Sequence, residues 1–148
     1  MNDIPSNAGL VDTYVSYPIA NILSQPLHDV GITPNQVTTF TLLIRIVAIY
    51  FLFKRQNRIL VFSLFLVSWF TDALDGLMAR KYNMTSEFGA HYDYIVDIST
   101  TLATLVTLYL QYYSKEKRQF VLLIGTLVIL HMMLAIKLRN SPPENLKP

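Results

Sequence analysis

Four long stretches of the chain are predominantly apolar and are separated by short, charged or polar connections. They cover residues 37–53, 59–79, 86–113 and 120–138. About 20 apolar residues are enough to cross a bilayer as a helix. Because lipid offers no hydrogen-bond partners to the backbone, spanning segments must be helices or closed barrels. The sequence therefore predicts an all-α integral membrane protein with about four transmembrane helices, the third long enough to protrude.

The segment before these stretches has an amphipathic pattern. In residues 10–27, apolar side chains recur at steps of three and four, and the other face is polar. Such a segment is too polar to span a bilayer, so we expect a helix lying in the membrane interface, with Pro18 and Pro26 kinking or breaking it. We expect one domain over 1–148, formed by a juxtamembrane segment (1–36), a transmembrane bundle (37–138) and a polar tail (139–148).

Composition supports this class and excludes others. Hydrophobic residues make up 52% and charged residues only 15% of the chain, which is well below the charged share of soluble domains. The absence of cysteine excludes disulfides and thiolate metal sites. A net charge of +2 without a basic stripe argues against nucleic-acid binding. Basic residues are divided almost evenly between the two sides of the predicted bundle, so charge bias does not determine its orientation.

Four aspartates lie inside or beside the second and third apolar stretches, where a charged side chain is costly. Asp72 and Asp75 are three residues apart, and Asp93 and Asp97 are four apart, so each pair shares one helix face. An antiparallel hairpin would bring all four to similar depths. Because hard oxygen ligands suit Mg²⁺ or Mn²⁺, we expect two such ions here.

The residues around the aspartates fit phosphate chemistry. A two-cation site suits phosphoryl or phosphodiester transfer, in which a carboxylate activates the attacking hydroxyl. Arg80 ends the second stretch, where its forked guanidinium is suited to a diphosphate. Alternatively, the aspartates line an aqueous cavity or pair with Arg45, Arg80 and Lys81, although these basic groups are few. Small residues allow close helix approach at four positions: Gly76, Ala79, Gly89 and Ala90.

The spacing of these residues resembles a known signature. Asp72-x-x-Asp75-Gly76-x-x-Ala79-Arg80-x8-Gly89-x3-Asp93-x3-Asp97 matches the class I CDP-alcohol phosphatidyltransferase family at every fixed position. Upstream, Thr33-Pro34-Asn35-Gln36-Val37-Thr38 is similar to the start of the first span in those enzymes. The resemblance covers roughly the first three predicted spans, and the rest only by hydropathy.

The resemblance implies an enzyme of phospholipid biosynthesis, a phosphotransferase for substituted phosphate groups. It would move a phosphatidyl or phospho-alcohol group from a CDP-linked donor to an alcohol acceptor and release CMP. By the same resemblance, the four aspartates are ligands of the two metal ions and Asp97 is also the general base. Gly76 and Arg80 would bind the donor diphosphate, with Ala79 and Gly89 packed close to it. Ser86 and Asn35 would line the donor pocket, and Thr85 is an equally good polar neighbour.

Further expectations also rest on the resemblance. It implies a multi-pass protein with its active site on the cytosolic side, membrane-lipid contacts and a homodimer. Family members usually have six membrane helices and this chain offers four, which leaves open whether it is active alone. Neither the acceptor alcohol nor the position of the CDP, on the lipid or on the head group, is identified. Two alternatives stay open: an intramembrane Mg-dependent prenyltransferase, and a truncated, non-catalytic cation-binding or scaffold relative.

Overall fold

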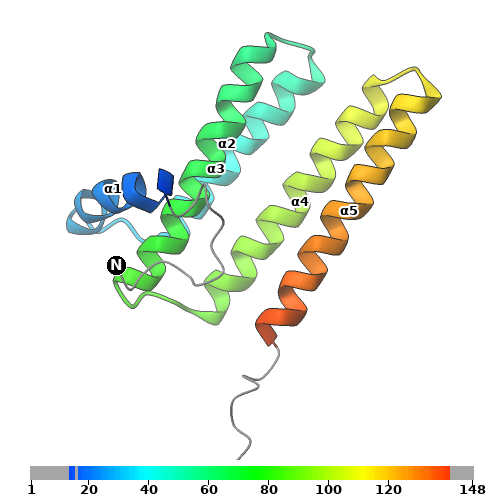
Figure 1. The fold of residues 1–148 in the computed structure, drawn as a ribbon. Coiled ribbons are helices and arrows are strands. Elements are labelled where there is room, and N and C mark those ends of the chain that lie inside the picture. Colours follow the sequence, from blue (N-terminus) through cyan, green and yellow to red (C-terminus); the bar gives the residue numbers. More distant parts are fainter. Residues whose placement is uncertain (1–13, 16, 141–148) are drawn as a thin grey trace, which may run out of the picture. The chain divides into compact units, whose positions relative to one another are not determined.

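The computed structural model describes residues 14–15 and 17–140, and helices form nearly all of this part of the chain (Figure 1). The predicted all-helical fold is confirmed, since no strand occurs among the described residues. The five helices are α1 (Tyr17–Asp29), α2 (Pro34–Phe53), α3 (Arg58–Lys81), α4 (Glu87–Gln111) and α5 (Lys115–Asn140).

Two of these helices have the length and apolar composition needed to cross a membrane. Among the described residues, α2 and α3 meet both requirements. Helices α4 and α5 have 25 and 26 residues, so they are also long enough for a bilayer. The predicted membrane fold is thus supported most directly by α2 and α3, and membrane crossing by α4 and α5 stays a prediction.

The chain divides into two compact units, Met1–Thr104 and Leu105–Pro148. The division falls within α4, so the first unit contains α1, α2, α3 and the N-terminal part of α4. All of the residues predicted for the functional site belong to the first unit.

Helix α1 is the described part of the predicted interfacial helix, whose first residues (10–13) and Ser16 lie outside the described part of the chain. Pro26 lies inside α1 and does not end it, so of the two expected effects, a kink or a break, the break does not occur at this residue. Ala20 and Ser24 are buried, while Ile19 and other large apolar side chains of α1 remain exposed. An exposed apolar face beside a packed one is the arrangement expected of a helix in the membrane interface.

The turn between α1 and α2 fixes where the first long helix begins. Gly31 has a φ of 81°, a left-handed conformation that glycine adopts without a steric penalty. Thr33 is extended (φ −92°, ψ 156°), as expected before a proline, and its backbone N–H donates to Gln36 Oε1 at 2.9 Å. The helix therefore starts at Pro34, three residues before the predicted apolar stretch, and places Asn35 in its first turn.

The core of the first unit joins α1, α2 and α3 near the motif. Its buried cluster consists of Ala20, Val37, Leu74, Leu77 and Met78. Figure 1 shows α2 and α3 side by side, and the buried Thr41 hydroxyl of α2 donates to Thr71 Oγ1 of α3 at 2.8 Å. Interhelical hydroxyl contacts of this kind stabilise helix pairs in membranes. The C-terminal half of α3, which carries Asp72 to Arg80, is consequently held between α1 and α2.

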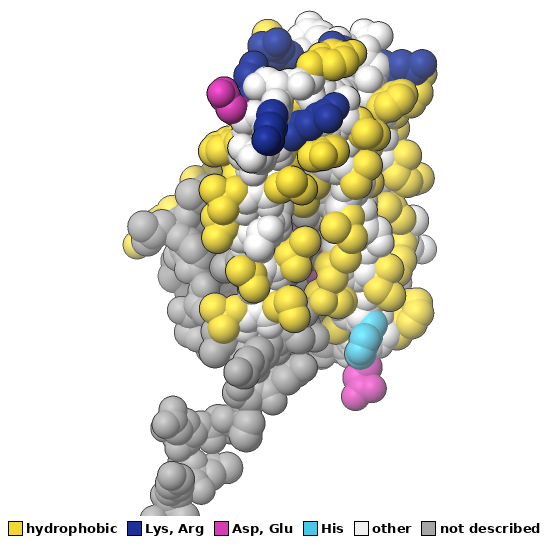
Figure 2. Space-filling model, turned by 90° about the vertical axis from the view of Figure 1, so that its right-hand side faces the viewer, with side chains coloured by type: hydrophobic (Ala, Val, Ile, Leu, Met, Phe, Trp, Pro, Cys, Tyr) yellow, Lys and Arg dark blue, Asp and Glu magenta, His cyan; other side chains and the backbone are white. Residues whose placement is uncertain are grey.

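The second unit contains the end of α4 and helix α5. Arg118 donates to the carbonyl of Tyr112 and lies 5.1 Å from the ring centre of Tyr109, while Lys117 lies 5.8 Å from the ring of Tyr112. Figure 2 shows a largely hydrophobic face, with Lys and Arg gathered at one end. Cations and aromatic rings beside an apolar surface are typical of a membrane boundary.

Candidate active site

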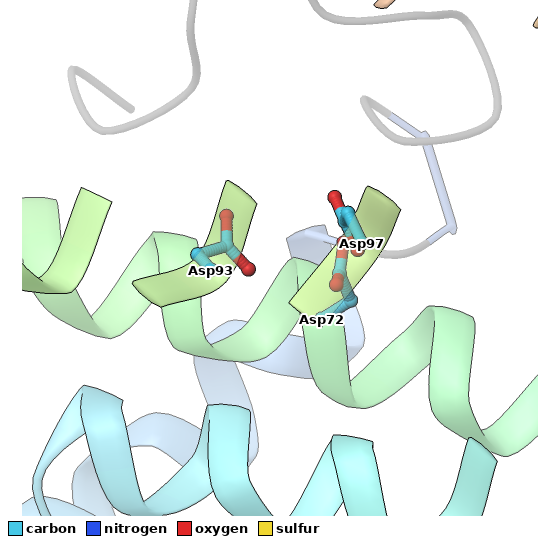
Figure 3. Close-up of side chains that lie close together, drawn as sticks. All are labelled: Asp72, Asp93 and Asp97. Carbon is cyan, nitrogen blue, oxygen red and sulfur yellow. The ribbon is translucent and has the colours of Figure 1, made fainter. Parts of the chain in front are cut away.

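Three of the four motif aspartates lie together (Figure 3). Asp72 comes from α3, and Asp93 and Asp97 come from α4; each offers one carboxylate oxygen, and these oxygens lie within 4.8 Å of one another. All three side chains are of intermediate burial. Several carboxylate oxygens at this separation fit a hard divalent cation such as Mg²⁺ or Mn²⁺. The helix pairing thus brings residues from both halves of the motif into one group.

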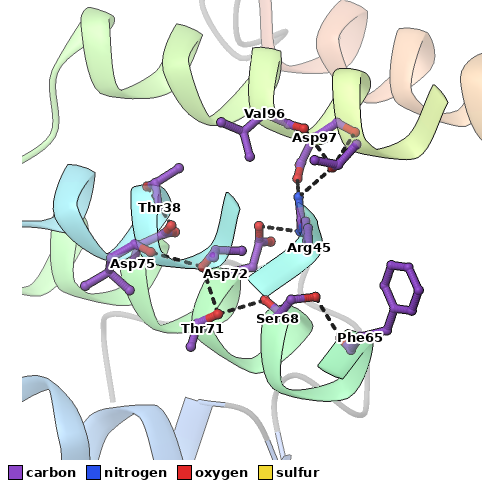
Figure 4. Close-up of polar contacts among 12 residues, drawn as sticks. Thr38, Arg45, Phe65, Ser68, Thr71, Asp72, Asp75, Val96 and Asp97 are labelled. Atoms are coloured by element: carbon purple, nitrogen blue, oxygen red, sulfur yellow. Dashed lines mark hydrogen bonds and ion pairs between the residues drawn. The ribbon is translucent and has the colours of Figure 1, made fainter. Parts of the chain in front are cut away.

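Asp75 faces a different neighbour. Its carboxylate is buried, and Oδ2 accepts a hydrogen bond of 2.7 Å from Thr38 Oγ1 of α2 (Figure 4). It is not part of the three-aspartate group found among the described residues. Thr38 also donates to the carbonyl of Pro34 at 3.2 Å, which keeps its hydroxyl between the two helices. A metal-ligand role for Asp75 stays a prediction.

A single arginine joins two members of the aspartate group. Arg45 of α2 donates to Asp72 Oδ1 at 2.9 Å through one guanidinium nitrogen and to Asp97 Oδ1 through the other (Figure 4). The Arg45 side chain is only 14% exposed, against 31% for each aspartate. Charged groups at membrane depth commonly pair in the bundle interior. Arg45, one of the basic residues that could pair with the aspartates, is therefore bound to two members of the group.

A cavity of about 230 Å³ is lined by three of the motif aspartates and by Arg80. Its lining combines carboxylates, small residues and two aromatic rings: Tyr17, Trp69, Asp72, Ala73, Asp75, Gly76, Arg80 and Asp93. A Cβ atom at Gly76 would lie 3.3 Å from an Arg80 guanidinium nitrogen, so glycine leaves room for the guanidinium along the helix. The cavity therefore combines carboxylates with a guanidinium in one lining, and both kinds of group are suited to an ion-bound diphosphate.

Helix α1 holds the end of α3 that carries Arg80. The Arg80 guanidinium donates to the Tyr17 hydroxyl at 3.2 Å, and Lys81 donates to Asn21 Oδ1 at 2.7 Å. Tyr82 stacks on His28 with ring centres 3.9 Å apart. Sequence reasoning did not identify Tyr17, because its position in an amphipathic helix has no distinctive spacing; only the packing of α1 against α3 brings it to the cavity.

The remaining predicted donor-binding residues form a second group beside the α3–α4 turn. The Gly89 backbone N–H donates to Ser86 Oγ at 3.0 Å, and a Cβ at Gly89 would lie only 2.8 Å from Asn35 Oδ1. Asn35 of α2, Ser86 just before α4 and Gly89 of α4 are thus brought together. Ala79 is half-buried, and its carbonyl accepts from the Met84 N–H at 2.9 Å where α3 ends.

Comparisons with a family model and with individual proteins point to the same family. Residues 31–144 match the CDP-alcohol phosphatidyltransferase family. An archaetidylinositol phosphate synthase from Pyrococcus horikoshii is 33% identical over 127 residues, which cover 86% of this chain and 66% of that protein. A CDP-diacylglycerol–inositol 3-phosphatidyltransferase from Saccharomyces cerevisiae is 43% identical over 61 residues (40% of this chain, 28% of that protein). A probable phosphatidylglycerophosphate synthase from Mycobacterium tuberculosis is 39% identical over 51 residues (34% and 24%).

The chain spans between about a quarter and two thirds of the length of these curated relatives. The family match nevertheless covers most of the chain and includes every position of the aspartate motif and Arg80. It also includes α2, whose Asn35 and Thr38 contact or approach motif residues. This protein therefore belongs to the CDP-alcohol phosphatidyltransferase family.

Proposed function

We propose that this protein transfers a substituted phosphate group from a CDP-linked donor to an alcohol and releases CMP, as a step in phospholipid synthesis. The observation that carries the proposal is the group formed by Asp72, Asp93 and Asp97 beside a cavity that Arg80 also lines. The family match supports this activity, and favours it over the prenyltransferase alternative. The names of the similar proteins describe phosphatidyltransferases and phospholipid synthases.

The acidic residues would hold the divalent cations on which the activity depends. Asp72, Asp93 and Asp97 would provide ligand oxygens on one side, and Asp75, which lines the same cavity, would supply further oxygens to a second Mg²⁺ or Mn²⁺. When bound, such ions neutralise charge on the donor diphosphate and on the leaving phosphate. Because the ligand carboxylates come from both α3 and α4, the bound ions would hold the donor in a fixed position relative to both helices.

The protein's other site residues would bind and orient the donor. Arg80 would donate to the diphosphate oxygens, and the Tyr17 hydroxyl would keep its guanidinium directed along the cavity wall. Gly76 would let the diphosphate and the guanidinium approach the backbone of α3. Asn35, Ser86 and Gly89 would contact the CDP moiety beside the α3–α4 turn, with Ala79 packed near it.

Asp97 would act as the general base. Its carboxylate takes the proton of the acceptor hydroxyl as that oxygen attacks the phosphorus that carries the transferred group. A new phosphorus–oxygen bond forms to the acceptor, and the bond between this phosphorus and the bridging oxygen of the diphosphate breaks. CMP leaves with the electron pair of that bond, and the proton stays on Asp97 until solvent removes it.

The membrane setting and the substrates are part of the proposal. We propose a multi-pass protein with the site at the cytosolic face, where a lipid-linked donor meets a water-soluble acceptor. The names of two relatives make inositol and inositol phosphate the first acceptors to test with a CDP-linked lipid. A homodimer is the expected assembly, and membrane lipids would surround it.

The test is release of CMP by the purified protein in lipid nanodiscs. Activity should require Mg²⁺ or Mn²⁺, disappear in EDTA and return when the ion is restored. The acceptor panel should include inositol, inositol phosphate, glycerol phosphate and serine, each with CDP-diacylglycerol and CDP-archaeol. Choline and ethanolamine should be supplied as CDP-linked head groups with diacylglycerol.

Binding of the donor without release of CMP in the presence of any acceptor would overturn the enzyme proposal in favour of a non-catalytic relative. Diphosphate release from a prenyl diphosphate would favour the prenyltransferase.

A further inference from the structure

Arg45 is the one charged residue of α2, and its guanidinium contacts two of the carboxylates that we propose as ligands of the cations. Its guanidinium donates to a carboxylate oxygen of Asp72 on α3 and to one of Asp97 on α4. Arg45 therefore links both helices that form the aspartate group. The family signature itself contains no arginine at this place. The guanidinium of Arg45 and the proposed divalent ions would therefore bind the same two carboxylates, Asp72 and Asp97.

We propose that Arg45 is a built-in counter-cation that competes with divalent metal for Asp72 and Asp97. It holds these two carboxylates together when metal is absent, and it must release at least one of them when metal binds. This inference rests on the proposed function, because it assumes that the aspartate group is a metal site. It extends that function by assigning to Arg45 control over how tightly the site binds its cations.

The first reason is that the guanidinium and a metal ion would use the same carboxylates. The oxygens that Arg45 contacts belong to two of the three carboxylates grouped within 4.8 Å. An ion bound among these carboxylates would stand close to the positive guanidinium, and like charges repel strongly where water is largely excluded. Binding of metal and retention of both ion pairs are therefore mutually opposed.

The second reason is that the metal-free aspartates need a counter-charge. Three carboxylates grouped at membrane depth repel one another, and unpaired charges there are costly. The largely buried guanidinium of Arg45 supplies two charge-assisted hydrogen bonds to them. Arg45 should consequently stabilise the folded protein without metal while weakening its affinity for metal.

The third reason is that a neighbouring acceptor is available to the displaced guanidinium. The nitrogen that contacts Asp97 also lies 3.4 Å from Thr100 Oγ1, almost one turn further along α4. A small movement toward this buried hydroxyl would free the Asp97 carboxylate without exposing the guanidinium to lipid. Release of Asp97 would also free the group that we propose as the general base.

The test compares Mn²⁺ binding and metal-free stability in nanodiscs, using the full chain and no substrate. Mn²⁺ affinity is measured from the electron paramagnetic resonance of free Mn²⁺, and unfolding temperature is measured in EDTA and in Mn²⁺. Arg45→Gln should bind Mn²⁺ about tenfold more tightly, should unfold at a lower temperature in EDTA, and should gain more from Mn²⁺ than the natural protein. Arg45→Lys should be intermediate, because an ammonium cannot bridge two carboxylates in the forked manner of arginine.

The control is Arg58→Gln at the exposed start of α3, which should leave Mn²⁺ affinity unchanged. Unchanged or weaker Mn²⁺ binding by Arg45→Gln would overturn the inference. If Arg45→Gln folds only in the presence of Mn²⁺, this dependence on the ion supports the inference that Arg45 stabilises the metal-free protein. Mn²⁺ affinity is then compared between Arg45→Lys and the natural protein. Because these measurements need no donor or acceptor, tighter Mn²⁺ binding without CMP release in the natural protein would reject the enzyme proposal alone. CMP release with unchanged Mn²⁺ affinity in Arg45→Gln would reject this inference alone.

Discussion

Thr38 on α2 donates a hydrogen bond of 2.7 Å to the buried carboxylate of Asp75 on α3. This contact separates Asp75 from the other three motif aspartates, which face α4 or belong to it. Asp75 thus has two roles in the fold: it connects α3 with α2, and it lines the cavity together with Asp72, Asp93 and Arg80. The motif aspartates are not four equivalent ligands in this fold.

Thr38→Val should destabilise the protein by about 1–3 kcal/mol, because it leaves a buried carboxylate without its hydroxyl donor. The matched control is Thr41→Val on the same helix, where a buried hydroxyl contacts Thr71 and no carboxylate is involved. That change should cost about 1 kcal/mol or less. Thermal unfolding in nanodiscs measures both. Equal losses in the two variants would show that the Thr38–Asp75 contact has no special importance.

Asp97→Asn should reduce CMP release by about 10²–10⁴-fold, because an amide cannot take the proton of the acceptor hydroxyl. Donor binding should remain detectable, since Arg80 and the other binding residues are unchanged. The control Asp29→Asn, at the exposed end of α1, should keep full activity. Initial rates and competition with a fluorescent CDP-lipid separate the two properties. An Asp97→Asn enzyme with most of its activity would disprove the assignment of the base.

Gly89→Ala should weaken donor binding about tenfold, seen as a higher KM for the CDP-linked donor. The added Cβ would lie 2.8 Å from Asn35 Oδ1 and 3.0 Å from Ser86 Oγ, so the group beside the α3–α4 turn must rearrange. Gly125→Ala is the control: its Cβ would meet Leu105 at 3.0 Å in the second unit, far along the sequence from the motif. Steady-state kinetics that show the same KM for both variants would contradict a donor-binding role for this group.

Tyr17→Phe should raise the donor KM about two- to fivefold with little change in kcat, because it removes one hydrogen bond that orients Arg80. Tyr14→Phe changes a mostly exposed ring nearby and should have no effect. Arg80→Lys should raise KM further, since an ammonium cannot bind a diphosphate through a planar fork. If Tyr17→Phe instead lowered kcat alone, Tyr17 would act on the chemical step and not through Arg80.

Several features of the fold and site were predictable because they depend on local sequence. Apolar length predicted the long helices, and the steric restriction on a residue that precedes proline explains the extended Thr33 before α2. The three- and four-residue spacings predicted that each aspartate pair shares a helix face. In agreement with these spacings, Asp93 and Asp97 of α4 lie together with Asp72 of α3.

Sequence alone could not determine how each helix is rotated about its axis. Spacing places Asp72 and Asp75 on one broad face, yet they lie at different angles on α3, and the position of α2 decides that Asp75 meets Thr38. The sequence offers Arg45 as a possible partner of the aspartates, but which two it contacts depends on where α2 lies relative to Asp72 of α3 and Asp97 of α4.

The sequence by itself determined the helical membrane fold and the acidic motif, because apolar length and residue spacing act within one segment. Tertiary structure decided which carboxylate binds a hydroxyl, which ones share a guanidinium, and that Tyr17 of α1 reaches Arg80. These contacts join residues from 27 to 63 positions apart in the chain. The geometry of these contacts depends on how whole helices pack against one another, and no short sequence pattern specifies that packing.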